Sequence, residues 1–126
     1  ITGKLSPQYD PIDLSQSVFP GGTITGCPKG RCMEIIEELE PVKRNLFYGS
    51  CGYLDWRGNL DLNILIRTLL YADSSDSTSK ATVWGQVGAG IVADSNPSKE
   101  WFESLQKAQA QLKALNLAAI LSPNTF

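Results

Sequence analysis

Two carboxylates and one ammonium share a side of the last predicted helix of this chain. Glu100, Glu103 and Lys107 are spaced three and four residues apart, so at 100° per residue they fall within about 60° of one another. Two carboxylates one turn apart can share a divalent cation, and the neighbouring ammonium can hold an anion. The alternative is a solvated helix face with a Glu103–Lys107 ion pair worth about 0.2–0.5 kcal/mol.

A glycine-rich segment offers a second kind of anion site. Residues 19–29 read Phe-Pro-Gly-Gly-Thr-Ile-Thr-Gly-Cys-Pro-Lys, and glycines let a backbone approach a ligand closely. Pro28 suits the first position of the helix that follows, where a missing N–H costs nothing. The start of that helix presents unpaired N–H groups and a positive dipole end. The pattern predicts an anion cradle, with a tight turn before a helix as the alternative.

Two further features bear on anion binding. Gly88, Ala89 and Gly90 end a predicted strand. Their backbone N–H groups could hold a carboxylate, or they form only a bulge or sharp bend. Arg67 is a charge within an otherwise apolar strand. It is either a surface residue on a wet sheet face or a bidentate fork for a carboxylate.

Helices and antiparallel strands are expected to position these residues. The predicted helices cover residues 10–18, 28–39 and 97 to about 115, and the predicted strands cover residues 46–56, 60–71 and 81–87. Only Arg57-Gly58-Asn59 separates the first two strands, so they should form an antiparallel hairpin. We therefore predict an α+β fold in which an antiparallel sheet packs with helices, and not a doubly wound parallel sheet.

Side-chain patterns predict which faces of these elements are covered. In the last helix, capped by Asn96 or Ser95, one narrow apolar stripe is the predicted core face; it consists of Trp101, Leu105, Ala108, Leu112 and Leu115. The acidic residues Glu37, Glu38 and Glu40 are predicted to be solvated. Residues 73–80 are expected to be a mobile hairpin tip, and residues 120–126 a flexible tail.

Composition favours one domain's worth of a soluble enzyme. The 126 residues carry 11 Lys and Arg against 13 Asp and Glu, so the chain lacks the basic field that nucleic-acid binding needs. We expect no membrane span and no signal peptide, because no apolar run is long enough. Cys27, Cys32 and Cys51 occur without any His, which is not a zinc pattern. They are expected to be reduced core thiols.

The motifs, in this order and spacing, resemble the chorismate-binding enzymes. The matching residues are 20–29, Arg31, 33–36, 52–53, 58–59, Asp61, 66–68, 88–92, 94–95, Glu100, Glu103 and Lys107. That family includes the large subunits of anthranilate synthase and aminodeoxychorismate synthase, and the isochorismate and salicylate synthases. Its members are several times longer. The resemblance therefore implies that residues 1–126 are the incomplete C-terminal portion of a chorismate-binding catalytic domain, an anthranilate synthase-like α/β sandwich.

The resemblance also implies a role for each candidate residue. Glu103 matches a magnesium ligand, and Glu100 matches a nearby carboxylate of the same Mg²⁺ site. The residues implied to bind chorismate are Thr23, Ile24 and Thr25 at the ring, Arg67 at the enolpyruvyl carboxylate, and Gly88, Ala89, Gly90 and Lys107 at substrate carboxylates. The general acid and base are expected upstream of Ile1, so no catalytic residue is assigned in this chain.

Within the family, residues 22–29 and 40–45 look most like aminodeoxychorismate synthase component I. The alternatives are anthranilate synthase component I and a non-catalytic remnant that binds an anion or a partner. Both enzymes commonly take ammonia from a glutamine amidotransferase. We expect the chain alone to be inactive and to self-associate, in a cytoplasmic protein or, for a plant-type source, one of the plastid stroma.

Overall fold

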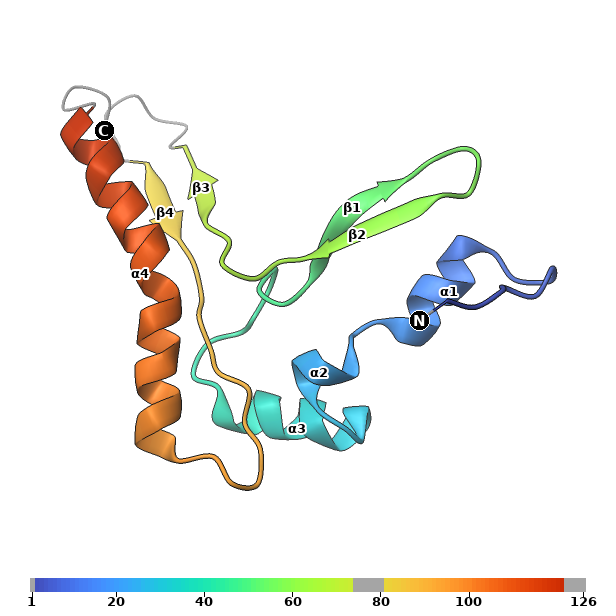
Figure 1. The fold of residues 1–126 in the computed structure, drawn as a ribbon, viewed down its shortest axis with the longest axis horizontal. Coiled ribbons are helices and arrows are strands. Elements are labelled where there is room, and N and C mark those ends of the chain that lie inside the picture. Colours follow the sequence, from blue (N-terminus) through green and yellow to red (C-terminus); the bar gives the residue numbers. More distant parts are fainter. Residues whose placement is uncertain (1, 74–80, 122–126) are drawn as a thin grey trace. The chain divides into compact units, whose positions relative to one another are not determined.

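The computed structural model describes residues 2–73 and 81–121 (Figure 1). The chain divides into two compact units, Ile1–Leu65 and Ile66–Phe126. The helices are α1 (Pro11–Val18), α2 (Gly22–Thr25), α3 (Lys29–Leu39) and α4 (Pro97–Leu121), and the strands are β1 (Ser50–Leu54), β2 (Leu60–Ile64), β3 (Leu70–Ala72) and β4 (Thr82–Trp84). Both sheets are two-stranded and antiparallel, which confirms the α+β class.

Capping residues set the starts of the first-unit helices. Asp10 caps α1, because its carboxylate accepts from the backbone N–H of Ile12 at 2.8 Å and of Asp13 at 2.9 Å. The Asp13 carboxylate accepts from the Asp10 N–H at 3.0 Å, which completes a capping box. Pro28 is the N-cap of α3 and not its first helical residue. Its missing N–H costs nothing there either, because that group has no partner in the helix.

The predicted hairpin is confirmed, with a shorter first strand. Strands β1 and β2 pair antiparallel from Leu54↔Leu60 to Ser50↔Ile64. The predicted strand from residue 46 begins only at Ser50, because Asn45 (φ 49°) and Tyr48 (φ 61°) have left-handed backbones that no strand accommodates.

A close backbone contact explains one glycine of the hairpin. A Cβ atom built on Gly52 would overlap the carbonyl oxygen of Asp61 on the opposite strand. The register places Gly52 opposite Leu62. Only glycine therefore fits at this point of the ladder.

The second unit contains β3, β4 and α4. The predicted strand over 60–71 is in fact two strands, because Arg67 has a φ of 50° and interrupts it. The predicted strand over 81–87 is limited to β4, which pairs with β3 from Leu70↔Trp84 to Ala72↔Thr82. Residues 74–80 of the predicted mobile tip lie outside the described residues.

Helix α4 is longer than predicted and is covered on a different side. Asn96 caps it by accepting from the Lys99 N–H at 3.2 Å. The helix includes the first two residues of the predicted tail, whose residues 122–126 lie outside the described part. Its half-buried residues are Glu100, Ser104, Lys107, Ala108, Gln111 and Leu115. Trp101, Leu105 and Leu112 are exposed, so the predicted core face is wrong for most of its members.

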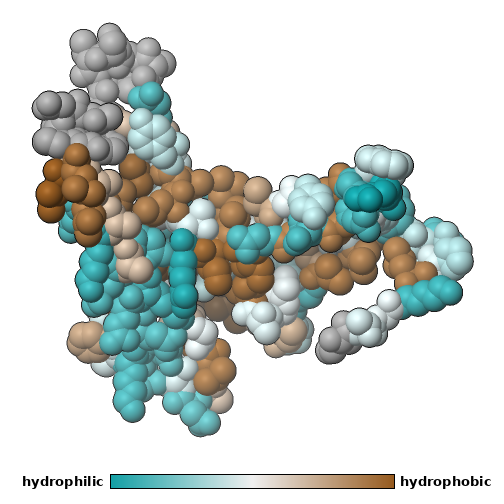
Figure 2. Space-filling model, turned by 45° about the horizontal axis from the view of Figure 1, so that its top comes forward, coloured by the Kyte–Doolittle hydropathy of each residue, from teal (hydrophilic) through white to brown (hydrophobic). Residues whose placement is uncertain are grey.

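No side chain among the described residues is buried. Figure 2 accordingly shows many hydrophobic side chains at the surface. The three thiols are free, as predicted, but Cys27 and Cys51 are exposed and Cys32 is half-buried, so they are not core residues here. Three of the five residues of the apolar stripe of α4, namely Trp101, Leu105 and Leu112, are likewise exposed.

Candidate functional site

Lys107 joins α4 to the glycine segment of the second unit. Its ammonium Nζ lies 2.6 Å from Oε1 of Glu103, one turn back on the helix. The same ammonium donates to the carbonyl oxygen of Gly88 at 3.3 Å. Lys107 is half-buried and Glu103 is exposed. The structure thus brings together three of the predicted site residues through one cation.

Glu100 completes the acidic side of α4. Its side chain lies one turn before Glu103, and the residue is half-buried. Mg²⁺ in proteins is commonly held by one or two carboxylates together with substrate oxygens and waters. Glu100 and Glu103 therefore fit part of a magnesium site. Within residues 2–73 and 81–121, no cluster of three or more His, Cys, Asp or Glu could hold a metal ion, so such a site needs oxygens from elsewhere.

The glycine segment leaves room for a ligand beside its backbone. Gly88 and Ala89 are half-buried and Gly90 is exposed, in a stretch without regular secondary structure after β4. A Cβ atom built on Gly90 would meet no atom of the described residues within 4 Å. Lys107 donates to the Gly88 carbonyl oxygen, and this contact uses none of the backbone N–H groups of the segment. The geometry is compatible with the predicted use of these amides for an anion.

Arg67 is not a strand residue, contrary to prediction. It lies between β2 and β3, exposed, with a φ of 50°. The hydroxyl of Thr68 donates to the carbonyl oxygen of Ile66 at 2.9 Å, which closes a local turn around it. A non-glycine residue with this backbone is uncommon and strained, and such strain is often found at functional sites.

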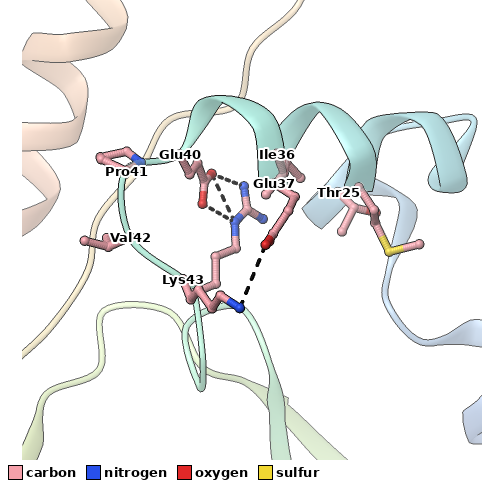
Figure 3. A pocket seen from close by; sticks show the side chains of 9 residues that line it. Thr25, Ile36, Glu37, Glu40, Pro41, Val42 and Lys43 are labelled. Carbon is pink, nitrogen blue, oxygen red and sulfur yellow. Dashed lines mark hydrogen bonds and ion pairs between the residues drawn. The ribbon is translucent and has the colours of Figure 1, made fainter.

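The remaining predicted site residues belong to the first unit. Thr23 is exposed, whereas Ile24 and Thr25 are half-buried, all within α2. The Oγ1 atom of Thr25 is buried without a hydrogen-bond partner among the described residues. Thr25 lines an open pocket of about 410 Å³ (Figure 3) whose other lining residues are Met33, Ile36, Glu37, Glu40, Pro41, Val42, Lys43 and Arg44.

An ion pair that the sequence patterns did not predict lies beside this pocket. Glu40 is half-buried and not solvated as predicted, and both of its oxygens accept from Arg44 Nε, at 3.1 and 2.9 Å. Nη2 of Arg44 lies 2.5 Å from Oε1. These hydrogen bonds raise the pKa of Arg44 above its usual value. The four-residue spacing is a signal for this pair, but it extends past Pro41, where the helical pattern ends.

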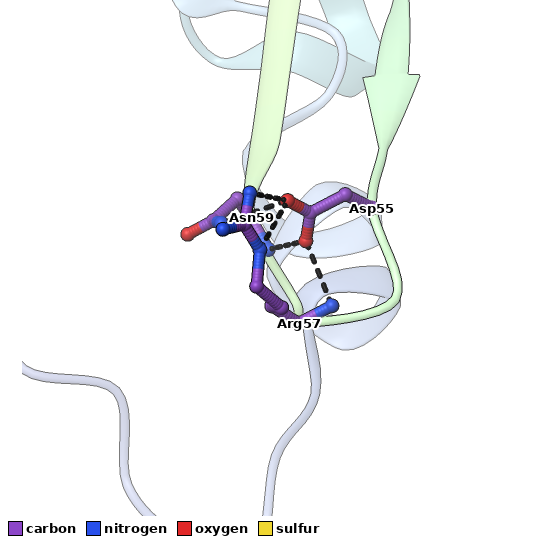
Figure 4. Close-up of polar contacts among 3 residues, drawn as sticks. All are labelled: Asp55, Arg57 and Asn59. Atoms are coloured by element: carbon purple, nitrogen blue, oxygen red, sulfur yellow. Dashed lines mark hydrogen bonds and ion pairs between the residues drawn. The ribbon is translucent and has the colours of Figure 1, made fainter.

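A second missed cluster closes the β1–β2 turn (Figure 4). The Asp55 carboxylate accepts from the Asn59 side chain at 2.8 Å and from the Asn59 N–H at 3.0 Å. It also accepts from the Arg57 N–H and guanidinium. These hydrogen bonds, with that of the Asn59 side chain the largest, lower the pKa of Asp55 to about 2.

Comparison with known proteins identifies the family. The profile of the chorismate binding enzymes matches residues 1–113. This chain belongs to the chorismate-binding enzyme family. The predicted family is thereby confirmed. All the candidate site residues, from Thr23 to Lys107, lie within the matched range.

Individual family members align with nearly all of the chain. It is 67% identical over 115 residues to the anthranilate synthase component I-like protein of Synechocystis. It is 46% identical over 118 residues to anthranilate synthase component 1 of Aquifex aeolicus, and 48% over 118 residues to aminodeoxychorismate synthase component 1 of Bacillus subtilis. These alignments cover 91–94% of this chain but only 22–24% of the relatives.

The same alignments do not separate the two aminating activities, since proteins with either name match at similar identity. As to membrane association, none of the helices within the described ranges combines the length and the apolar character needed to cross a bilayer.

Proposed function

We propose that this chain is part of an enzyme that aminates chorismate. The observation that carries the proposal is the Lys107 ammonium, which contacts Glu103 and the Gly88 backbone together. Family membership supplies the substrate class. The chain spans less than a quarter of the relatives that it matches, so the general acid and base are assigned to other parts of the polypeptide.

The described residues have separate tasks in this proposal. Glu100 and Glu103 would hold magnesium, which would neutralise the ring carboxylate of chorismate and orient the ring. Lys107 offers a point charge to a substrate carboxylate, whereas Arg67 offers a bidentate fork to the enolpyruvyl carboxylate. The backbone N–H groups of 88–90 hold a carboxylate by direct contact, and Thr23, Ile24 and Thr25 line the ring.

The proposed product is 4-amino-4-deoxychorismate, formed when an amine replaces the 4-hydroxyl of chorismate. Residues 22–29 and 40–45, which look most like aminodeoxychorismate synthase component I, support this product. A glutamine amidotransferase partner would supply the ammonia. The second candidate is anthranilate formation, which aminates C2 and eliminates pyruvate. The 67% identity to the Synechocystis anthranilate synthase component I-like protein favours it.

Product analysis separates the candidates. The full-length polypeptide is incubated with chorismate, magnesium and an ammonium salt, with a reaction lacking ammonium as the control. We expect ammonium-dependent formation of an aminated chorismate without release of pyruvate. Release of pyruvate with fluorescent anthranilate would establish the second candidate instead. No consumption of chorismate under any condition would overturn the enzymatic proposal and favour the non-catalytic remnant.

A further inference from the structure

Arg44 connects α2, which lies within the glycine-rich segment, to the C-terminal end of α3. Its Nη1 atom donates a long hydrogen bond of 3.4 Å to the carbonyl oxygen of Ile24. Ile24 is the third residue of the four-residue helix α2. The last carbonyls of a helix have no partner within it, and α2 has no side-chain hydrogen bond at its N-cap either. The guanidinium therefore provides a side-chain tether for a very short helix.

Glu40 fixes the guanidinium at the other end. It is the C-cap of α3, where its N–H donates to the carbonyl oxygen of Ile36 at 2.9 Å. Its carboxylate binds Arg44 through Nε and Nη2, a bidentate geometry that restricts the rotation of the arginine. The Arg44 guanidinium carbon also lies 5.4 Å from the centre of the Tyr48 ring. Three contacts thus hold the donor that reaches Ile24.

Both ends of α2 lie close to cysteine side chains. A Cβ atom built on Gly26 would lie 2.7 Å from Sγ of Cys32 in α3, and one on Gly22 would lie 2.9 Å from Sγ of Cys27. The glycines allow this close approach. A shift of the Ile24 carbonyl would therefore move Thr23 and Thr25, the residues on either side of it, as a group.

We propose that Arg44, held by Glu40, is a positioning residue that sets the Thr23–Thr25 segment for chorismate. The inference rests on the proposed function, because the substrate comes from there. Arg44 acts through the backbone of Ile24 and is given no contact with substrate. Its loss should therefore weaken chorismate binding and leave the chemical step and the magnesium requirement largely unchanged.

A neighbouring ion pair supplies a matched control (Figure 3). Lys43 lies next to Arg44 in sequence and pairs with Glu37 at 3.9 Å, with side chains 81% and 74% exposed. The corresponding values for Arg44 and Glu40 are 22% and 35%. Lys43→Met removes the same charge from the same loop, but removes no donor to α2. Comparing it with Arg44→Met isolates the tether from the charge.

The kinetic test uses the full-length polypeptide with chorismate, magnesium and an ammonium salt. Arg44→Met should raise KM for chorismate about tenfold, equivalent to about 1.4 kcal/mol, with kcat little changed. Glu40→Gln should raise KM for chorismate less, because Arg44 can still donate to the Ile24 carbonyl oxygen but loses its ion pair with residue 40. Lys43→Met and Glu37→Gln should keep the wild-type KM. Equal KM values in the Arg44 and Lys43 variants, or a fall in kcat alone, would overturn the proposal.

Two further measurements separate positioning from general stability. Amide hydrogen exchange at residues 22–26 should become faster in Arg44→Met than in Lys43→Met, with or without chorismate. In Arg44→Ala, added guanidinium ion at low concentration should restore part of the lost chorismate affinity. If wild type itself turns over no chorismate, the proposed function fails, and the exchange data still decide whether Arg44 holds α2. Unchanged exchange would reject the tether regardless of activity.

Discussion

At the scale of single residues, Lys107 has a partner in each of two backbone segments. A lysine ammonium has three donors, and two contacts occupy it here, with Glu103 and with the Gly88 carbonyl. Glu103 is thus already paired with an ammonium in the absence of a metal ion. A magnesium ion at Glu103 would therefore have to compete with Lys107 or leave the ammonium free for a substrate carboxylate.

The first prediction concerns Glu103 in the full-length polypeptide. Glu103→Gln should lower magnesium-dependent turnover at least about 100-fold, because an amide lacks the charge that a hard cation requires. Since Glu103 is exposed, circular dichroism should show an unchanged fold. Glu38→Gln, an exposed carboxylate on α3, is the matched control. Wild-type kinetics for Glu103→Gln at limiting magnesium would show that this helix face is only a solvated surface.

The second prediction concerns the two cations of the second unit. Arg67→Ala should raise KM for chorismate about 10- to 100-fold, as expected for loss of a charged hydrogen-bonding group. Lys107→Ala should have a milder effect, because it removes a point charge and no fork. Lys113→Ala, an exposed lysine on the same helix, is the control. Steady-state kinetics at varied chorismate concentration measures these KM values. Equal values for all three variants would show that neither Arg67 nor Lys107 binds the substrate.

The third prediction concerns the pH dependence of the Asp55 turn. The pKa of Asp55 is lowered to about 2 in the folded chain, from a usual value of 3.8. Its stabilising contribution is therefore complete above pH about 4, and is lost as the pH falls towards 2. At pH 7, the midpoint temperature of thermal unfolding should be higher for the wild type than for the Asp55→Asn variant. The difference should narrow below pH about 4. If the difference between the two midpoints stayed constant down to pH 3, ionisation of Asp55 would not be its cause.

At the scale of elements, residues that act on their immediate neighbours predicted helices and turns more accurately than side-chain patterns predicted strand length or the covered face of a helix. The proline at the start of α3 and the short Arg57–Asn59 turn both act on neighbouring residues, and the elements they imply are present. The strand over 60–71 failed because alternation cannot reveal that Arg67 takes a left-handed backbone. Which face of α4 is covered depends on tertiary partners, which helical periodicity does not encode.

The same distinction applies to the candidate site. Helical spacing alone placed Glu103 and Lys107 in contact, and the structure contains that pair. The contact of Lys107 with Gly88 spans 19 residues, so no local pattern could have predicted it. Glu40 and Arg44 are four residues apart, as in a helical ion pair. However, α3 ends at Leu39, so the two residues do not lie on one helix. Their side chains meet because the loop turns back.

The fourth prediction tests the close pairing of β1 with β2. Gly52→Ala should destabilise the hairpin by about 1–3 kcal/mol, because its Cβ would overlap the Asp61 carbonyl oxygen. Gly30→Ala is the control, since a Cβ there meets no atom within 4 Å in the part of the chain that the structure describes, and alanine favours a helix. Chemical denaturation of the full-length variants measures both effects. An alanine at residue 52 that leaves stability unchanged would show that the strands separate easily at this point.

At the scale of the whole molecule, the described chain has little interior of its own. None of its described side chains is buried, and it spans 22–24% of the relatives that it matches. Large apolar side chains are exposed on both units, among them Leu39 and Val42 in the first and Ile91 and Val92 in the second. Exposed apolar surface of this extent is typical of an interface.

The fifth prediction follows for the 126-residue chain prepared alone. It should form no aminated product from chorismate and ammonia, because the acid and base are proposed to lie elsewhere. It should also self-associate through its apolar surface and its exposed strand edges. Light scattering after size-exclusion chromatography measures the association, and Leu112→Glu on α4 should reduce it. A monodisperse, monomeric chain would contradict the prediction, as would ammonia-dependent product.

The exposure of the three tryptophans gives the chain a spectroscopic reporter. Trp56 at the hairpin turn is 93% exposed, Trp101 on α4 is 63% exposed, and Trp84 at the end of β4 is 47% exposed. An indole in contact with water emits at longer wavelength than one in an apolar setting. The emission of the isolated chain should therefore be red-shifted and readily quenched by iodide. Single Trp→Phe variants would then show which of the three tryptophans is shielded from solvent when further protein covers the surface around it.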